Sequence, residues 1–183
     1  LALYAGYRAS LDLDFFNPKK QFRLASLLAH LTKDENLWTT DIAEGGTVYG
    51  RLLNAKISFI AYPFFIPRER PKWYGTIRVL HPRDIAVMKA IAISQRGRKR
   101  DFVDMYWYIK HRESLVDVLR RLPDQYPNIA HDYHHILKSL VYFNDADQDP
   151  MPKIFFKTTW SEIKKYFQRE VPIIIKEFLG LHS

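Results

Sequence analysis

Residues 6–16 read GYRASLDLDFF, and this stretch decides which fold the sequence predicts. Apolar residues at positions 11, 13 and 15 alternate with polar residues at positions 10, 12 and 14, a period of two that is typical of a β-strand. Side chains two residues apart on a strand point to the same face of the sheet. Asp12 and Asp14 are therefore expected to project together. Asn17-Pro18 ends this strand, because proline cannot donate to a β-ladder.

The paired carboxylates of Asp12 and Asp14 favour a metal site. Two ionised carboxylates that lie close together repel each other unless a cation lies between them, and oxygen ligands with room for phosphate suit Mg²⁺ or Mn²⁺. An Asp-x-Asp pair alone, which is common, favours a solvated strand face instead. Ser10 and Arg8 precede Asp12 by two and four residues, where they would supply a hydroxyl group and a cation for a phosphate. An amphipathic edge strand is the alternative.

The first 80 residues combine short strands with one helix, and the remainder is mainly helical. Periodicity predicts a helix over 19–31 and strands over 2–5, 11–16, 47–52, 55–62 and 76–80. Leu53-Asn54 links two of these strands as a hairpin, and three prolines among many charges predict a loop over 63–75. Further helices are predicted over 81–96, 101–112, 114–121, 129–142 and 160–178. The pattern indicates an α+β protein.

A second candidate site lies around Lys89, which apolar residues surround in the segment DIAVMKAIAI. A lysine on a mostly buried helix face needs an exit for its ammonium group or an anionic partner, such as a phosphate or a carboxylate. A lysine that snorkels to solvent is the alternative. Arg96 follows seven residues later on the same helix face, where it is expected to extend a phosphate-binding surface. Asp101 is expected to pair with Lys89 or Arg96 or to position a nucleophile, or else to stabilise a helix N-terminus.

The composition limits the class of protein. The chain has 183 residues, 15% aromatic residues, no cysteine and a formal net charge of +8. The aromatic content excludes disorder over most of the length, and the lack of cysteine excludes disulfides and thiolate metal sites. No apolar run is long enough to span a membrane, so a cytoplasmic protein with no membrane partner is expected. The basic balance favours nucleotides or nucleic acid as partners, and a merely cationic surface is the alternative.

Three other groups of residues are expected to be structural. His131, His134 and His135 lack a helical HExxH pattern, so surface or core positions are favoured over a metal site. The acidic stretch over 144–152 lacks the glycine and the terminal glutamate of an EF-hand. Core or interface positions, rather than base-stacking roles, are expected for the tryptophans, Trp38, Trp73, Trp107 and Trp160.

Three stretches together resemble the AbiEii/AbiGii toxin-type nucleotidyltransferases, the effector halves of bacterial toxin–antitoxin and phage-abortive systems. The first is GYRASLDLDFF at 6–16, which is similar to that family's Gly-His-Arg-x-Ser-x-Asp-x-Asp-Phe signature. The second, at 84–109, is DIAVMKAIAISQRGRKRDFVDMYWYI. It is similar to the family's helix with a central lysine, followed by Arg-Gly and then Arg/Lys-Asp-Phe-x-Asp-Leu/Met-Tyr. The third is LVYFNDADQDPMP at 140–152 with the following Trp160-Ser-Glu-Ile-Lys. The resemblance spans nearly the whole chain.

The resemblance implies a nucleotidyltransferase fold of the DNA-polymerase-β type, a small mixed sheet flanked by helices with a helical C-terminal part. It implies a core over 1–110, truncated at its N-terminus, and a helical region over 111–183 packed on that core. It also implies Mg²⁺ or Mn²⁺, an NTP substrate, a tRNA or protein acceptor and a cognate antitoxin. Matching positions imply catalytic roles for Asp12, Asp14, Lys89 and Asp101, metal binding by Asp12 and Asp14, and nucleotide binding by Arg8, Ser10, Lys89 and Arg96.

The sequence departs from the family pattern in three places. The family usually has a Gly-Gly or Gly-Ser turn before the carboxylate strand, where backbone N–H groups hold phosphate, and this sequence begins at Leu1 without it. Ser58 stands where a third carboxylate is expected, and Tyr7 stands where the family often has histidine. These departures predict weak catalysis. They keep a second hypothesis open, a non-catalytic or degenerate member that acts as a basic RNA- or protein-binding module.

Overall fold

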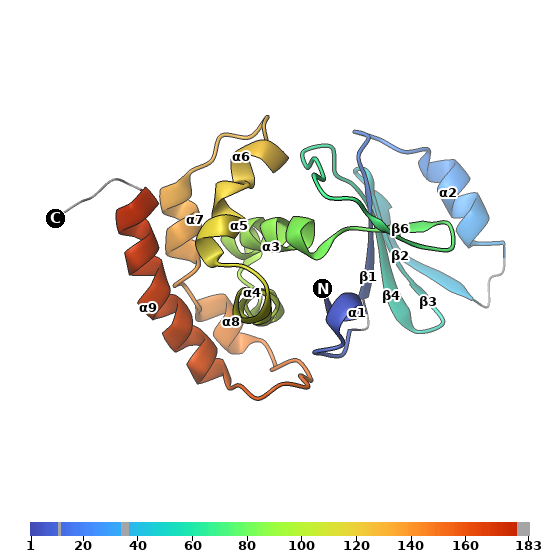
Figure 1. Ribbon diagram of the computed structural model, residues 1–183. Coiled ribbons are helices and arrows are strands. Elements are labelled where there is room, and N and C mark those ends of the chain that lie inside the picture. Colours follow the sequence, from blue (N-terminus) through green and yellow to red (C-terminus); the bar gives the residue numbers. More distant parts are fainter. Residues whose placement is uncertain (11, 34–36, 179–183) are drawn as a thin grey trace. The chain divides into compact units, whose positions relative to one another are not determined.

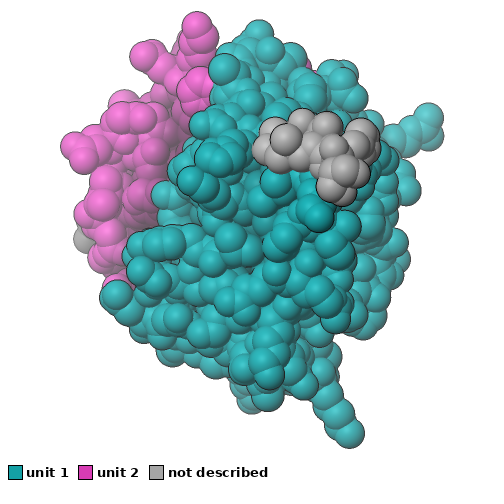
Figure 2. Space-filling model, turned by 90° about the vertical axis from the view of Figure 1, so that its left-hand side faces the viewer, with its two compact units in different colours: residues 1–9, 67–183 teal, residues 10–66 magenta. Residues whose placement is uncertain are grey.

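The computed structural model describes residues 1–10, 12–33 and 37–178 (Figure 1). The chain forms two compact units, coloured separately in Figure 2: unit 2 contains residues 10–66, and unit 1 contains residues 1–9 and those from Pro67 onward. The predicted α+β class is confirmed, because unit 2 contains a small mixed sheet and unit 1 is mainly helical. The division expected near residue 110 falls inside unit 1.

Unit 2 is built on a four-stranded sheet. Its strand order is β1-β4-β3-β2, with β1 (Asp12–Asn17) parallel to β4 (Ala55–Ala61). Strand β3 (Thr47–Leu52) lies antiparallel to both β4 and β2 (Trp38–Glu44). Helix α2 (Leu24–Leu31) connects β1 to β2 in the chain order. The strand that carries the two aspartates is therefore an edge strand, paired in parallel with β4.

The hairpin predicted around Leu53-Asn54 is confirmed. These two residues have positive φ angles of 48° and 70°, as a two-residue turn of type I′ requires. The strand predicted over 11–16 corresponds to β1, although residue 11 itself lies outside the described residues. The sequence pattern does not predict β2, because a register shift between Thr40 and Ile42 interrupts its alternation.

The two faces of this sheet differ in polarity. On one face, Trp38, Val48 and Ile57 form a buried cluster against the apolar side chains of α2. Strand β1 adds Phe15 to this cluster. Because side chains alternate along a strand, Asp12 and Asp14 project from the opposite face, which α2 does not cover.

Unit 1 consists of helices and one short hairpin. Its elements are α1 (Ala2–Ala5), β5 (Lys72–Tyr74), β6 (Ile77–Val79), α3 (Pro82–Arg96), α4 (Lys99–His111), α5 (Leu115–Arg120), α6 (Leu122–Gln125), α7 (Tyr133–Ser139), α8 (Asn144–Gln148) and α9 (Trp160–Phe178). The strand predicted over 2–5 is wrong: alanine and leucine favour the helix α1, which Gly6 ends in a left-handed conformation with φ of 60°. Strand β5 lies in the region predicted as a loop.

Helices α3 and α4 form the centre of unit 1. The ring of His81 accepts a hydrogen bond from the backbone N–H of Arg83 and caps the start of α3. Gly97, with φ of 51°, ends α3 as predicted, and α4 begins two residues later. Helices α3 and α4 pack against each other, and α7 and α9 pack against this pair. Within the described ranges, no helix combines the length and the apolar character that a bilayer crossing requires.

Candidate functional site

The carboxylates of Asp12 and Asp14 lie on the sheet face of unit 2 that α2 leaves uncovered. The parallel register pairs Asp12 with Lys56 and Asp14 with Ser58. Ser58 is 4% exposed, and its hydroxyl group donates a hydrogen bond to Oδ1 of Asp14. The position opposite Asp14 therefore holds a hydrogen-bond donor, which orients the carboxylate but adds no further negative charge.

The oxygen donors on this face are of the kind that hard cations prefer. Mg²⁺ typically takes one or two protein carboxylates and completes its coordination with water and substrate phosphates. Asp12 and Asp14 fit that requirement. Among the described residues, no group of three or more histidine, aspartate or glutamate side chains is arranged to hold a metal ion. The exposed hydroxyl group of Ser10 lies 3.5 Å from the carbonyl oxygen of Asp12.

Arg8 does not lie on the carboxylate strand. It belongs to unit 1, where its backbone forms an isolated β-bridge with Ile154. Strand β1 begins only at Asp12, so the shared strand face expected for Arg8 and Asp12 is not formed. The Nη2 atom of Arg8 donates to Oδ2 of Asp104 at 2.9 Å, and its Nε atom donates to Oδ1 of the same carboxylate. The Arg8 side chain, 10% exposed, is therefore held by Asp104.

A set of ion pairs and hydrogen bonds, most of them buried, joins α3 and α4. The ammonium group of Lys89 donates to Oδ1 of Asp101 at 2.6 Å and lies 2.9 Å from Oδ2 of Asp104. The Nε atom of Arg96 donates to Oδ2 of Asp101 at 3.0 Å. The Asp101 and Asp104 side chains are 0% and 1% exposed. We call this set the charge network, comprising Tyr7, Arg8, Lys89, Arg96, Asp101 and Asp104.

Ion pairing keeps the network charged in spite of its burial. Burial raises the pKa of Asp104, but the positive charges of Lys89 and Arg8 lower it by more than burial raises it. The pKa is therefore held well below its usual range. Burial likewise opposes ionisation of Asp101, yet Lys89 and Arg96 lower its pKa. For Lys89 the signs reverse: burial lowers the pKa, and Asp104 and Asp101 raise it above its ordinary value. These three groups are therefore ionised near neutral pH.

Residue spacing explains how the network assembles. Lys89 and Arg96 lie seven residues apart on α3, which is about two helical turns. Asp101 and Asp104 lie three apart on α4 and so share a face. The turn at Gly97 brings these two faces together. The expected pairing of Asp101 is confirmed for both cations.

Sequence patterns do not identify two members of the charge network. The position of Asp104, one helical turn after Asp101, could have indicated that both residues share a helix face. Its burial and its three partners are not visible in the sequence. The hydroxyl group of Tyr7 donates to Oδ1 of Asp104 at 2.7 Å. No local pattern links Tyr7 to a residue 97 positions away.

The histidines and the acidic stretch make structural contacts. A ring nitrogen of His131 lies 3.1 Å from the carbonyl oxygen of Tyr126, and a ring nitrogen of His135 lies 3.1 Å from that of Ser94. In the acidic stretch, Asp147 accepts hydrogen bonds from the Trp160 indole and from Lys164. Asp149 accepts from Arg98.

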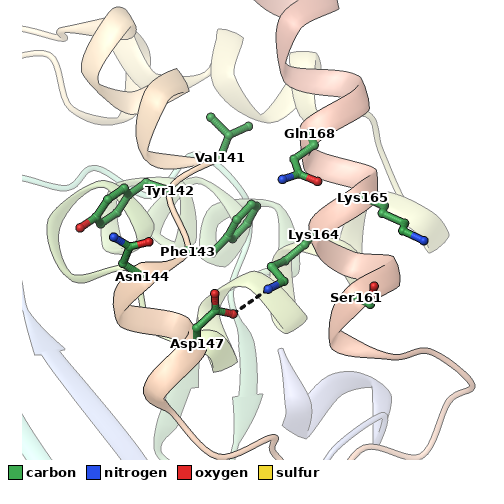
Figure 3. A pocket seen from close by; sticks show the side chains of 9 residues that line it. All are labelled: Val141, Tyr142, Phe143, Asn144, Asp147, Ser161, Lys164, Lys165 and Gln168. Atoms are coloured by element: carbon green, nitrogen blue, oxygen red, sulfur yellow. Dashed lines mark hydrogen bonds and ion pairs between the residues drawn. The ribbon is translucent and has the colours of Figure 1, made fainter.

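One cavity of unit 1, with a volume of about 400 Å³, lies between residues 141–147 and α9. Lys164 points across it toward Asp147, and their charged atoms lie 2.9 Å apart (Figure 3). Lys165 and Tyr142 also line this cavity. None of the predicted site residues lines it.

The tryptophans differ in exposure. Trp38 and Trp107 are 4% and 8% exposed, as expected for core residues. Trp73, on β5, is 59% exposed, so a core position is excluded for it.

Residues 41–178 match the protein family described as the nucleotidyl transferase AbiEii toxin of the type IV toxin–antitoxin system. The matched range contains Lys89, Arg96 and Asp101 and begins after β1. A protein of Aquifex aeolicus (strain VF5), described as uncharacterized, is 35% identical over 184 residues, which cover 98% of this chain and 84% of that protein. No solved structure matches the chain. Because the family match extends over well more than half of its length, the chain belongs to the AbiEii family of nucleotidyl transferase toxins.

Proposed function

We propose that this protein transfers a nucleotide from an NTP to an RNA, such as tRNA, or to a protein acceptor, that Mg²⁺ or Mn²⁺ supports the reaction, and that a cognate antitoxin opposes it. Membership of the AbiEii family supports nucleotidyl transfer and the toxin role. One structural observation carries the metal dependence. Asp12 and Asp14 project from the same sheet face, which α2 leaves uncovered, and Ser58 orients the second of them.

In this proposal Asp12 and Asp14 are the metal ligands. A bound divalent cation would neutralise negative charge on the transferring phosphoryl group. The hydrogen bond from Ser58 fixes one oxygen of Asp14 and leaves the other carboxylate oxygen for coordination. The exposed Ser10 hydroxyl group is assigned to a phosphate oxygen.

The cations of the charge network are assigned to the triphosphate. The Arg96 side chain is 50% exposed while Asp101 holds its Nε atom, so the guanidinium group is both oriented and accessible. Lys89 is only 17% exposed, and it adds positive potential while Asp101 fixes its position. Arg8 acts as a positioning residue through Asp104. Catalysis on this basis rests on positioning and on charge stabilisation.

Label transfer tests this proposal. The protein is incubated with each labelled NTP, with Mg²⁺ or Mn²⁺, and with RNA and protein acceptors, and the label on each acceptor is measured. Asp12→Asn and Asp14→Asn are expected to slow transfer by more than about 100-fold, because the loss of a metal ligand removes about 3 kcal/mol of transition-state stabilisation. Asp41→Asn is the matched control, since Asp41 is a 47% exposed acid on β2 of the same unit.

Three results would contradict the proposal. The first is that the wild-type protein transfers no label to any acceptor. The second is that transfer persists in both β1 variants. The third is an equal loss in the Asp41→Asn control, which would indicate a general effect of removing an acid from unit 2.

Growth of a bacterial host tests the toxin role separately. Induced expression of the wild-type chain is expected to slow growth, and Asp12→Asn is expected to relieve this effect at equal expression. The Asp41→Asn control is expected to remain toxic. Toxicity that survives Asp12→Asn would separate the toxin role from metal-dependent transfer.

A non-catalytic binding module is the second candidate, and Ser58 is the observation that favours it. The position opposite Asp14 holds a hydroxyl group where a third carboxylate is expected. Calorimetry with Mg²⁺ and each NTP distinguishes the candidates. The enzyme is expected to bind both ligands, with binding lost in Asp12→Asn, whereas a binding module is expected to bind neither and to show salt-sensitive RNA binding.

A further inference from the structure

The hairpin formed by β5 and β6 exposes three large side chains. Trp73 is 59% exposed, Tyr74 is 43% exposed and Ile77 is 47% exposed. Trp38 and Trp107 elsewhere in the chain are buried. The register places Tyr74 beside Ile77 on one face of the hairpin and Trp73 on the other. Large side chains exposed in this way mark a contact site for a partner.

Each aromatic ring of this hairpin has a cation beside it. The antiparallel register places Trp73 opposite Arg78, whose guanidinium carbon lies 6.0 Å from the Trp73 ring centroid. On the other face, the Nζ atom of Lys72 lies 5.2 Å from the Tyr74 ring centroid. We call these four residues the hairpin surface. It carries an aromatic–cation pair on each face.

The charge of the surrounding segment is strongly positive. Residues 67–80 contain four arginine or lysine residues and one acid, Glu69. Glu69 accepts a hydrogen bond from Arg83 at 3.1 Å, so its charge is already paired outside the hairpin. The segment therefore complements a polyanion.

Hydrogen bonds anchor both ends of the hairpin. The buried carboxylate of Asp84 accepts the backbone N–H groups of Arg68 and Glu69, each at 3.2 Å. At the other end, the Tyr4 hydroxyl group donates to the carbonyl oxygen of Val79 at 3.2 Å. A two-stranded hairpin is marginally stable alone, so these anchors preorganise the surface and lower the entropic cost of binding.

One class of partner matches rings and cations together. A single strand of nucleic acid exposes the faces of its bases and its phosphates at once, so bases stack on aromatic side chains while phosphates contact lysine and arginine. A duplex keeps its base faces stacked inside and can use only the cations. An acidic protein surface also satisfies the cations, but it has no base faces to stack on exposed rings.

We propose that the hairpin surface binds a single-stranded segment of nucleic acid on the face that carries Trp73 and Arg78, with a base stacked on Trp73 and a phosphate beside Arg78. This proposal goes beyond the transferase function. It concerns binding that needs neither an NTP nor a metal ion, so it holds or fails independently of label transfer.

Fluorescence anisotropy with the full chain tests the proposal. The probes are labelled single-stranded RNA and DNA of about 12 nucleotides, a typical length for single-strand-binding domains, and the matching duplexes. Trp73→Ala is expected to weaken single-strand binding about tenfold, which equals about 1.4 kcal/mol. Trp73→Phe is expected to retain most of the affinity, because a phenyl ring still stacks. Arg78→Ala is expected to weaken binding and to reduce the salt slope by about one.

Phe155→Ala is the matched control. Phe155 is 60% exposed in the same unit, and the Nζ atom of Lys153 lies 5.8 Å from its ring centroid. It is thus an aromatic–cation pair of equal exposure outside the hairpin, and its removal is expected to leave the affinity unchanged. Thermal melting of each variant checks folding, which Trp73→Ala is expected to preserve because the ring is mostly exposed.

Preference for single strands over duplexes, lost in Trp73→Ala and kept in Trp73→Phe, supports the proposal, and the RNA and DNA probes show which strand is preferred. Equal affinity for duplexes, or unchanged affinity in Trp73→Ala, overturns it. An equal loss in Phe155→Ala also overturns it, because the cationic surface as a whole would then bind. Absence of binding to either single strand at low salt overturns it too and leaves the hairpin as a protein contact.

Discussion

Removing the charge of Asp104 is the sharpest test of the charge network. The carboxylate is 1% exposed and accepts hydrogen bonds from Tyr7 and Arg8, and Lys89 lies 2.9 Å away. Asp104→Asn keeps the size of the side chain but removes the charge that compensates two cations. We expect the variant to have a lower free energy of unfolding than the wild type.

The burial of the partners sets the magnitude. Removing one member of a buried ion pair costs about 3–5 kcal/mol, because it leaves a buried charge without compensation. Arg8 and Lys89 are 10% and 17% exposed, and Asp101 still pairs with Lys89 in the variant. We therefore expect a loss near the lower limit, about 3 kcal/mol. For a chain of this size, that loss lowers Tm by roughly 6–12 °C.

Denaturant and thermal unfolding, followed by circular dichroism, measure this loss. Asp145→Asn is the control, since Asp145 is an exposed acid at the start of α8, and it is expected to change the free energy of unfolding by less than about 0.5 kcal/mol. A loss below about 1 kcal/mol for Asp104→Asn, or an equal loss in the control, would refute the view that buried ion pairing stabilises unit 1.

The pKa shifts predict how this stability depends on pH. The folded pKa of Asp104 lies below its ordinary value of 3.8, so its contribution is present above pH 3.8 and is lost as pH falls through the folded pKa. The folded pKa of Lys89 lies above its ordinary value of 10.5, so its contribution is present below pH 10.5 and is lost as pH rises through the folded pKa. The free energy of unfolding is expected to fall less steeply with acid in Asp104→Asn than in the wild type. Identical acid-side slopes would show that Asp104 is not the titrating group.

Two further predictions concern unit 2. A Cβ atom at Gly50 would overlap the Trp38 ring and the Thr39 carbonyl oxygen, so Gly50→Ala is expected to lower the free energy of unfolding by about 1–3 kcal/mol; an unchanged denaturation midpoint would show that the strands shift to accept it. Ser58→Asp adds a carboxylate opposite Asp14, which is expected to destabilise the metal-free protein by repulsion and to tighten Mn²⁺ binding about tenfold in calorimetry; no gain in affinity would count against a metal on this face.

Local patterns predicted those elements whose signals are themselves local. The period of two predicted β1, and the turn at Leu53-Asn54 and the cap at Gly97 were likewise predicted from adjacent residues. The strand expected over 2–5 was wrong, because four residues hold too little periodicity to outweigh the helix preference of alanine and leucine. Strand β2 was missed where its bulge interrupts the alternation.

Local sequence patterns are enough to show that Asp12 and Asp14 share one face of a strand, and that Lys89 and Arg96 share one face of a helix. These relations follow from the periods of the strand and the helix, which are properties of the backbone and need no knowledge of distant residues.

The contacts that those side chains make depend on the packing of distant parts of the chain. Ser58, 44 residues from Asp14, reaches its carboxylate because β4 pairs in parallel with β1 in one particular register. Asp104 contacts Tyr7, Arg8 and Lys89, which come from two distant parts of the chain. Strand register and helix packing depend on how whole faces fit together, and no local pattern of residues specifies that fit.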